Sequence, residues 1–420
     1  MGDSDGMRSE AQSRYLIVGG GLAAAKAVEG IREHDPSGPI TVVTAETHLP
    51  YERPPLSKGV LAGNDGAETV YPHPQEWYDQ QGVELHLGDP AVSVDARQRT
   101  VRLASGADLA WERLLLATGS VVRRIDVPGA DLPGVRYLRT LDDSLGLLDQ
   151  LRAGGDVVVV GAGWIGLEVA AAARAHGCRV TVLEPQPTPL WAVLGERVGG
   201  WFAQLHEDHG VDLRLKTGVS RFVGDDAVRA VVTDNDVTIE ADVVVVGVGI
   251  IPDTRLAEGA GVVVDNGVVT DSSLRTSVPG IWAAGDVANW ESALLGRHVR
   301  VEHWANAHDG GLAAGRSMAG AEVAYDPVPF FYSDQYDAGL EYAGYVPRDA
   351  EAEVILRGDS GTGAFMAFWV VPAEAGVRLL AGMHVNTWDT MDGVQSLIRA
   401  RTVVSPGRLA DPSVPLTDLT

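Results

Sequence analysis

Two stretches of the sequence carry the glycine spacing of a dinucleotide-binding turn. Residues 15–46 read YLIVGGGLAAAKAVEGIREHDPSGPITVVTAE, and residues 157–184 read VVVVGAGWIGLEVAAAARAHGCRVTVLE. In the G-x-G-x-x-G/A pattern, one glycine permits a tight turn, the next lets the backbone approach a pyrophosphate, and the last position allows close helix-to-strand packing. The pattern is filled by Gly19, Gly21 and Ala24 in the first stretch and by Gly161, Gly163 and Gly166 in the second.

Each turn lies in the plan of a βαβ unit, with an apolar strand, an alanine-rich helix and a second strand that is predicted to end in an acid, Glu46 or Glu184. The helix N-terminus offers free N–H groups to phosphates, and the acid can accept hydrogen bonds from a ribose. Glu184 is followed by Pro185 and Gln186 rather than arginine, which favours NADH over NADPH because a 2′-phosphate would meet negative charge. Such turns also occur for packing alone, but two copies with acids favour nucleotide binding.

Two further segments resemble strand ends that contact a flavin. LLLATGS (114–120) is an apolar strand ending in a small-residue turn, and GIWAAGDVANW (280–290) is predicted to be a strand that ends at Gly285 and Asp286 ahead of a helix. A carboxylate at the C-terminal end of a strand lies where open α/β sheets bind ligands, and it would suit a ribityl hydroxyl. The alternative is that Asp286 only caps the helix.

Composition limits the setting of these motifs. With 420 residues, 45% of them hydrophobic, the chain can form two or three domains. The first fourteen residues are polar and no run of about 18 apolar residues occurs, so we expect a cytoplasmic protein without a membrane span. The single cysteine, Cys178, excludes an internal disulfide and a cysteine metal site, and we expect no metal. The net charge of −24 argues against nucleic acid or anionic membrane as a partner, or reflects solubility alone.

The order of motifs along the chain resembles the bacterial NADH-dependent ferredoxin reductases, flavoproteins that supply electrons to oxygenases and cytochromes P450. The matching motifs are GGGLAA, PYERPPLSK (50–58), ATG (117–119), YLRTLDD (137–143), GAGWIGLE, AAGD (283–286), EHWANA (302–307) and FFYSDQYD (330–337). The likeness extends over about residues 15–415, and the pair PPLSK and SDQYD is more specific than either glycine turn.

This resemblance implies an α/β fold with two Rossmann-like dinucleotide-binding domains, for FAD and NADH, plus a C-terminal α+β interface domain, as in glutathione reductase-like folds. The implied domains are a polar N-terminal tail (1–14), an FAD-binding domain in two pieces (15–120 and 255–325), an NADH-binding domain (121–254) and the interface domain (326–420). The oligomeric state, monomer or weak dimer, is left open.

The resemblance also implies cofactor-binding residues. Those matched position by position to FAD contacts are Ala23, Glu46, Lys58, Val92, Arg139, Asp286 and Trp304, with Arg53 in addition. Further FAD candidates are Gly19, Gly21, Leu22, Ala24, Ala117, Thr118, Gly119, Gly285 and Tyr332, and the NADH candidates are Gly161, Gly163, Trp164, Ile165, Gly166, Glu184 and Gly249. Trp304 would begin a helix whose N–H groups face the pyrimidine end of the flavin, or it could belong to core packing.

Lys58 and Glu168 are the implied catalytic residues. In the family, the matching acid pairs with the PPLSK lysine beside the flavin N5 atom. A cation held there would favour the electron-rich reduced flavin and help to orient the nicotinamide. Alternatively, Glu168 only interacts favourably with the dipole of its helix, and Lys58 is a surface lysine.

Two cradles would let NADH give a hydride to FAD, which passes single electrons to an outside acceptor. The chain has no CxxC or cysteine on its first helix, and we expect Cys178 to be a small buried hydrophobe, so no internal thiol relay is available. The resemblance implies a small iron–sulfur protein as acceptor, either ferredoxin or rubredoxin, which would serve a cytochrome P450 or an oxygenase. The alternative is a redox-responsive binding protein like apoptosis-inducing factor, or a slow NADH diaphorase.

The expected partner surface is less defined. Ferredoxins are usually acidic, as this chain is, so docking would need a local basic patch. Candidates are Arg297, Arg300, Arg399, Arg401 and Arg408. The chain also departs from the family where Tyr332 stands at a position that is often tryptophan, which leaves the partner's identity open.

Overall fold

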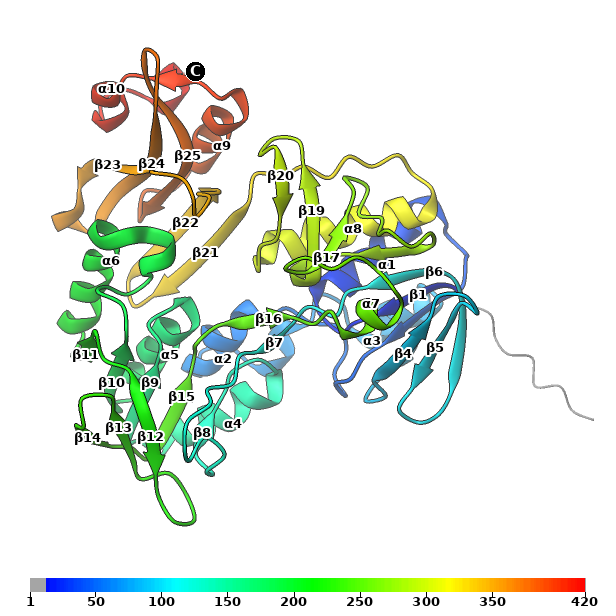
Figure 1. Cartoon of the computed structure of the whole chain (residues 1–420), viewed down its shortest axis with the longest axis horizontal. Helices are drawn as coiled ribbons and strands as arrows, with labels where there is room; N and C mark the ends of the chain where they lie inside the picture. Colours follow the sequence, from blue (N-terminus) through cyan, green and yellow to red (C-terminus); the bar gives the residue numbers. More distant parts are fainter. Residues whose placement is uncertain (1–12, 420) are drawn as a thin grey trace, which may run out of the picture. The chain divides into compact units, whose positions relative to one another are not determined.

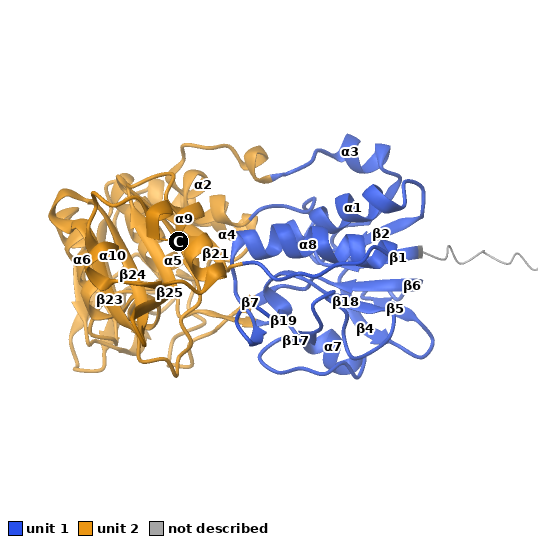
Figure 2. Ribbon diagram, turned by 90° about the horizontal axis from the view of Figure 1, so that it is seen from above, with its two compact units in different colours: residues 1–52, 71–120, 252–327 blue, residues 53–70, 121–251, 328–420 orange. Residues whose placement is uncertain are grey.

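The computed structural model describes residues 13–419, and the chain forms two compact units (Figures 1 and 2). Unit 1 contains residues 1–52, 71–120 and 252–327, and unit 2 contains residues 53–70, 121–251 and 328–420. Most of the predicted polar tail lies outside the described residues. Strands β7 (Ser120–Val122) and β16 (Ile250–Pro252), which pair with each other, lie where the chain changes unit. The division into FAD, NADH and interface domains stays a prediction.

A seven-stranded sheet forms the centre of unit 1, in the order β3-β2-β1-β6-β5-β4 with β18 beside β6. Its strands are β1 (Ser13–Val18), β2 (Ile40–Val43), β3 (Val83–His86), β4 (Ala91–Asp95), β5 (Thr100–Leu103), β6 (Asp108–Leu116) and β18 (Ile281–Ala283). The pairs β1–β2, β2–β3, β1–β6 and β6–β18 are parallel, whereas β4, β5 and β6 form an antiparallel meander. The continuous burial of residues 15–18 and 40–43 is typical of parallel strands covered on both faces.

The helices of unit 1 are α1 (Leu22–His34), α3 (Gln75–Gln80), α7 (Arg255–Gly259) and α8 (Trp304–Ala319), with the 3-10 turn η3 (Gly285–Val287). Helices α1 and α8 lie side by side (Figure 1). Their contact depends on small residues: a Cβ atom on Gly311 would lie 2.4 Å from the Ala23 carbonyl oxygen, and one on Gly315 would lie 2.2 Å from that of Ala27. The backbones of the two helices therefore approach each other more closely than larger side chains would allow.

The segment after Asp286 corrects one prediction. We expected a helix there, but the chain makes only the 3-10 turn η3 and continues as strand β19 (Ala288–Ser292). This strand pairs with β17 (Val268–Thr270) and β20 (Arg297–Val299) in a separate three-stranded sheet. Asp286 is not an N-cap either, since Ala284 holds that position. Strand partners distant in sequence decide the structure of this segment, which its local sequence does not reveal.

Unit 2 contains a five-stranded parallel sheet in the order β11-β10-β9-β15-β8. Its strands are β8 (Val135–Arg136), β9 (Asp156–Val160), β10 (Arg179–Glu184), β11 (Asp212–Leu215) and β15 (Val243–Val246). A small antiparallel sheet consists of β12 (Val219–Val223), β13 (Ala230–Thr233) and β14 (Thr238–Glu240). The helices of this part are α2 (Gly59–Ala62), α4 (Leu141–Arg152), α5 (Trp164–Ala175) and α6 (Trp191–Asp208), and the 3-10 turns are η1 (Pro54–Ser57) and η2 (Ala67–Val70).

The C-terminal part of unit 2 is an antiparallel sheet in the order β21-β22-β25-β24-β23, with β26 beside β25. Its strands are β21 (Phe330–Gln335), β22 (Ala338–Gly344), β23 (Glu353–Asp359), β24 (Ala364–Ala373), β25 (Gly376–Val385) and β26 (Val403–Val404). The helical elements are α9 (Met391–Ala400), α10 (Pro406–Ala410), η4 (Ser360–Thr362) and η5 (Leu416–Leu419).

The two parts of unit 2 share one hydrophobic core. Residues of α5, α6 and the parallel sheet pack in the same cluster as residues of β22, β24 and β25. Aromatic pairs fix the contact: the rings of Trp164 and Phe331 lie 5.0 Å apart, and those of Trp201 and Phe365 lie 5.3 Å apart. Helix α5 is therefore held against β21, which places Glu168 of α5 next to side chains of the SDQYD segment. The predicted α/β fold with two βαβ units and a C-terminal sheet is confirmed.

Candidate functional site

The first glycine turn, in unit 1, has the geometry of a phosphate cradle. Gly19 has φ of +145°, and a Cβ atom there would lie 2.1 Å from the carbonyl oxygen of Ala117, so only glycine fits. Gly21 is the N-cap of α1, where no side chain caps the helix and a Cβ atom would meet nothing within 4 Å. Open space in front of uncapped first-turn amides fits a pyrophosphate. Leu22 begins the helix, and Ala24 is fully buried beneath it.

The other candidates in this cradle come from the ends of β6 and β18. Gly285 has φ of +77°, and a Cβ atom there would lie 3.1 Å from the Cβ atom of Ala23, which brings these two candidates together. The Thr118 hydroxyl donates to the carbonyl oxygen of Asp253 at 2.7 Å, so it orders the turn after β6. Gly119 completes that turn with φ of +65°. These small residues line the same edge of the sheet as the glycine turn.

Two residues of the PYERP segment, which the sequence analysis did not single out, hold predicted cofactor contacts in unit 1. The Tyr51 hydroxyl donates to Glu46 Oε2 at 2.6 Å, and the Trp304 indole Nε1 donates to Glu52 Oε2 at 3.0 Å. Trp304 begins α8, as predicted, and its ring stacks on His308. It is partly exposed, so the alternative of a core tryptophan does not describe it.

Val92 and Asp286 occupy other places in unit 1. Val92 lies where the register of β4 shifts, so it has no partner residue in β5, and the residue is 55% exposed. Such a bulge leaves backbone groups available to another partner. Asp286 lies in η3, where its carbonyl oxygen accepts from Arg300 Nη1 at 3.2 Å. Arg300, one of the arginines considered for docking, also pairs with Glu302.

The second glycine turn, in unit 2, repeats the cradle with closer packing. Gly161 has φ of +100°, and a Cβ atom there would lie 2.5 Å from the carbonyl oxygen of Gly247. Gly163 is the uncapped N-cap of α5 and faces open space. A Cβ atom on Gly166 would lie 2.1 Å from the carbonyl oxygen of Gly161, so this third glycine lets the helix approach the turn. Of the two residues that begin α5, Trp164 packs inward and Ile165 is 44% exposed.

Glu184 ends β10 as a buried carboxylate, with only 8% of the residue exposed. One of its oxygens accepts from the Ala162 backbone N–H at 2.7 Å and the other from that of Gln186 at 2.8 Å. These bonds fix the charge beside the glycine turn, and each oxygen keeps a further lone pair for a hydroxyl donor. Gly249, with φ of +102°, faces open space after β15, and its carbonyl oxygen accepts from Arg123.

Lys58 and Glu168 form an ion pair within unit 2, across 110 residues of sequence. The residue Glu168 is only 4% exposed, and the Lys58 side chain is 15% exposed, so Lys58 is not a freely solvated surface lysine. The carboxylate also accepts from the hydroxyls of Ser57 and Ser333, the latter at 2.5 Å. The ammonium lies 5.6 Å from the centre of the Tyr332 ring, a cation–π distance. Buried charges need hydrogen-bond or ionic partners, and the Glu168 carboxylate has three, namely Lys58, Ser57 and Ser333.

Arg53 and Arg139 also meet in unit 2. The Arg53 guanidinium donates to the Arg139 carbonyl oxygen. The Arg139 N–H donates to Asp143 Oδ2 at 3.1 Å, just before the capping box that Thr140 and Asp143 make at the start of α4. The predicted site residues thus fall into two groups, one in each unit. Unit 1 carries the first cradle with Glu46, Val92, Asp286 and Trp304, and unit 2 carries the second cradle with Arg53, Lys58, Arg139, Glu168 and Tyr332.

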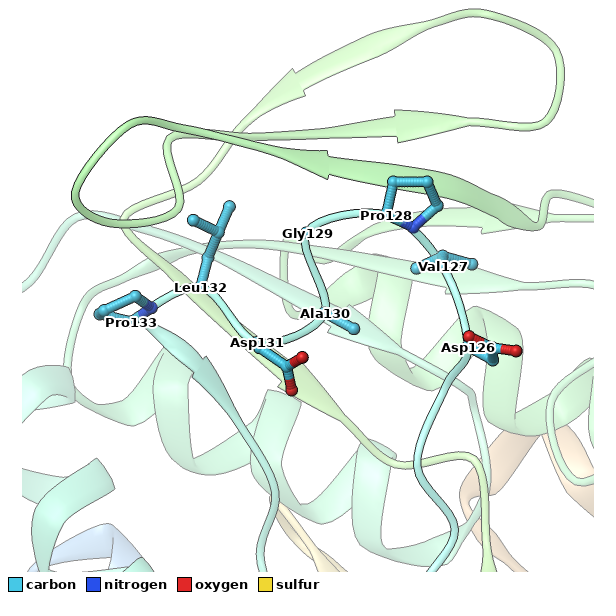
Figure 3. A pocket seen from close by; sticks show the side chains of 8 residues that line it. All are labelled: Asp126, Val127, Pro128, Gly129, Ala130, Asp131, Leu132 and Pro133. Carbon is cyan, nitrogen blue, oxygen red and sulfur yellow. The ribbon is translucent and has the colours of Figure 1, made fainter.

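Cys178 and an open hollow are two further features of unit 2. Cys178 is fully buried before β10, its thiol donates to the Leu151 carbonyl oxygen at 3.3 Å, and burial raises its pKa. The burial agrees with the prediction that Cys178 is a small buried hydrophobe. The hollow follows the loop of residues 126–133 (Figure 3), where Asp126 and Asp131 are its charged residues. None of the predicted site residues lines it.

Each glycine cradle lies at a helix N-terminus and has an acid near the end of its second strand: Glu184 is the last residue of β10, whereas Glu46 follows the end of β2 at Val43 rather than ending the strand as predicted. Two such cradles define a protein that binds two dinucleotides. The chain belongs to the pyridine nucleotide-disulphide oxidoreductase family, whose model matches residues 13–311, and a second model, reductase C-terminal, matches residues 330–420. Membership implies binding of FAD and NAD(P)H.

The chain is similar over nearly its whole length to reductases of oxygenase and P450 systems. It is 38% identical to the anthranilate 1,2-dioxygenase system ferredoxin–NAD(+) reductase component of Burkholderia cepacia, covering 96% of this chain and 98% of the relative. Rhodocoxin reductase of Rhodococcus erythropolis is 37% identical, with 94% and 92% covered.

Solved structures give the same result. The ferredoxin reductase for the CYP199A2 system from Rhodopseudomonas palustris has a TM-score of 0.90 at 35% identity, covering 97% of this chain and 99% of the other. The covalent putidaredoxin reductase–putidaredoxin complex contains a chain with a TM-score of 0.91 at 34% identity, with 96% and 97% covered. Within residues 13–419, no helix combines the length and the apolar character needed to cross a membrane.

Proposed function

We propose that the chain is an NADH-dependent ferredoxin reductase, which takes a hydride from NADH onto FAD and delivers single electrons to a small iron–sulfur protein of a P450 or oxygenase system. The observation that carries this proposal is the pair of glycine cradles in a chain whose relatives are reductases of such systems. FAD, when bound, supplies the conversion of a two-electron donation into one-electron steps. The balanced reaction oxidises one NADH, reduces two iron–sulfur proteins and releases one proton.

Each cradle binds its pyrophosphate through the uncapped first-turn amides of α1 or α5, and the macrodipole of each helix favours the negative charge. We assign FAD to the first cradle and NADH to the second, following the family order. Glu46, held by Tyr51, binds a ribose of FAD.

Selection of NADH over NADPH is assigned to Glu184. Its charge is fixed beside the turn by the N–H groups of Ala162 and Gln186, so a 2′-phosphate brought there would face a buried carboxylate. The same carboxylate can accept a ribose hydroxyl.

Lys58, oriented by Glu168, is the residue that would present a cation to the flavin ring when FAD is bound. Because a low dielectric strengthens its field, a lysine that is mostly withdrawn from water acts more strongly than a solvated one. No cysteine pair can take part, since Cys178 is the only cysteine of the sequence and is buried. Electrons therefore leave for an outside acceptor directly.

The test is reduction of cytochrome c by the purified, FAD-loaded protein with NADH or NADPH, with and without an added ferredoxin. We expect bleaching of the yellow flavin by NADH and strong stimulation of cytochrome c reduction by ferredoxin. A long-lived reduced complex that ferredoxin does not discharge would contradict the proposal and favour a binding protein that responds to NADH.

A further inference from the structure

A chain of hydrogen bonds leads from Glu168 away from Lys58 and through the core of unit 2. Ser333 of β21 donates to Glu168 Oε1 at 2.5 Å, and Gln335 of the same strand donates through Nε2 to Ser333 Oγ at 3.2 Å. The Oε1 atom of Gln335 lies 2.9 Å from Nε2 of His206, which is on α6. All four side chains belong to fully or almost fully buried residues. This series of hydrogen bonds therefore links three elements, α5, β21 and α6, behind the ion pair of Lys58 and Glu168.

Every bond of this chain has a fixed direction. Ser333 has one hydroxyl proton and uses it for the carboxylate, so its oxygen accepts from the amide of Gln335. The Gln335 oxygen then faces His206, whose Nε2 must carry a proton. Burial lowers the pKa of His206 to about 4, so the ring is neutral near pH 7 and Nδ1 is an acceptor. Tyr336 completes the series, with its hydroxyl 3.3 Å from Nδ1.

All the donors therefore point toward one carboxylate. Hydrogen bonds in series polarise one another, and the low dielectric of a buried site strengthens each of them. The charge of Glu168 is thus stabilised by an ordered set of dipoles in addition to Ser57 and Lys58. Here the direction ends at the carboxylate that pairs with the Lys58 ammonium.

We infer that Ser333, Gln335 and His206 are positioning residues, which hold Glu168 and through it keep Lys58 in the orientation that hydride transfer requires. This inference rests on the proposed function. If the Ser333 bond is lost, Glu168 can rotate, and Lys58 is then free to extend toward water. A rotated lysine still provides a charge but no longer a fixed one, so the effect should fall on the rate of flavin reduction rather than on NADH binding.

The experiment measures anaerobic flavin reduction by NADH in a stopped-flow instrument, with the FAD-loaded full chain. The variants are His206→Leu, which removes the Nε2–H donor, and His206→Gln, which keeps an amide donor at a similar position. We expect His206→Leu to lower the limiting rate about three- to ten-fold, the loss expected for one buried hydrogen bond, with little change in the apparent NADH affinity. His206→Gln should restore most of the rate. Val198→Ala is the matched control, because it loosens the packing of buried Val198 on α6 without removing a donor.

A double-mutant cycle with Lys58→Ala decides between coupling and general loosening of the core. If His206 acts through Lys58, adding His206→Leu to Lys58→Ala should cause no further loss of rate. Equal effects of His206→Leu in both backgrounds, or a loss of rate in Val198→Ala as large as in His206→Leu, would overturn the inference. Two other results would contradict the proposed function itself. In the first, NADH does not reduce the flavin of the unmodified protein. In the second, NADH reduces the flavin of the Lys58→Ala variant as fast as that of the unmodified protein.

Discussion

The neutral state of His206 gives a stability prediction that needs no assay of activity. Its pKa is lowered from 6.5 to about 4, first by burial and then by the charge of His209, while its bond to Gln335 acts in the opposite direction. The groups that face the ring are Gln335, Tyr336 and His209. Below pH 6.5 the unfolded chain binds a proton at this residue and the folded chain does not, so the free energy of unfolding falls as the pH falls, until about pH 4.

The magnitude follows from the two pKa values. Between pH 7 and pH 5, the difference in proton binding at His206 removes about 2 kcal/mol from the free energy of unfolding. His206→Gln keeps a donor for Gln335 but does not titrate, so this part of the pH dependence should disappear. The assay is urea unfolding of the FAD-loaded protein at pH 7 and pH 5, followed by circular dichroism. For each protein, the loss is the free energy of unfolding at pH 7 minus that at pH 5. Subtracting the loss in the variant from the loss in the unmodified protein cancels the contributions of the other titrating groups.

Two results would refute this reasoning. If both proteins lose the same stability between pH 7 and pH 5, His206 is not held neutral in the folded state. If the variant loses more, the folded state binds a proton at His206 more tightly than the unfolded chain does, the opposite of a lowered pKa. A small difference in stability at pH 7 would not affect the conclusion, because the linkage depends only on the change with pH.

Substitutions at four other residues test the remaining features. Glu184→Ala should weaken NADH binding about ten-fold, the loss expected for a charged hydrogen bond, and should reduce the preference over NADPH; equal selectivity before and after would exclude Glu184 as the determinant. Gly161→Ala places a Cβ atom 2.5 Å from the Gly247 oxygen and should weaken NADH binding with FAD retained, as titration and flavin absorbance would show. Glu52→Ala frees the Trp304 indole and should weaken FAD binding about five-fold, whereas Glu52→Gln keeps an acceptor and should not. Cys178→Ser should leave flavin reduction within about two-fold, since the thiol only meets a carbonyl oxygen; an inactive variant would revive a thiol relay.

The glycine turns show what could be predicted from the sequence. The close contact of Gly166 is with Gly161 of the same turn, and Gly163 faces open space, so a short motif contains much of the information. The close contact of Gly161 is with Gly247, which follows β15 and lies outside the motif. The position of Trp304 at the start of α8 was likewise predicted. The strand after Asp286 was not, because its pairing with β17 and β20 depends on segments that the motif does not include.

The surroundings of Glu168 could be predicted from the sequence only in part. Ser57 and Ser333 belong to the two motifs that indicated the family, PPLSK and SDQYD, so their place in those motifs was the available signal. His206 offered none, since a histidine in an amphipathic helix does not reveal which strand faces it. Its contact with Gln335 spans 129 residues and arises only when α6 packs on the C-terminal sheet. Side-chain networks that join separate elements depend on tertiary packing, which periodicity and spacing do not encode.

The two cradles reach a similar geometry by different close contacts. In the second cradle the third motif position must be glycine, because a Cβ atom on Gly166 would lie 2.1 Å from the Gly161 oxygen. In the first cradle the same position is Ala24, whose Cβ is accommodated in a fully buried site. A close contact of α1 is made instead with α8, where a Cβ atom on Gly311 would lie 2.4 Å from the Ala23 carbonyl oxygen. The orientation of the α1 N-terminus therefore depends on α8, the helix that Trp304 begins, so a larger residue at Gly311 should disturb the first cradle as much as a change in the glycine turn itself.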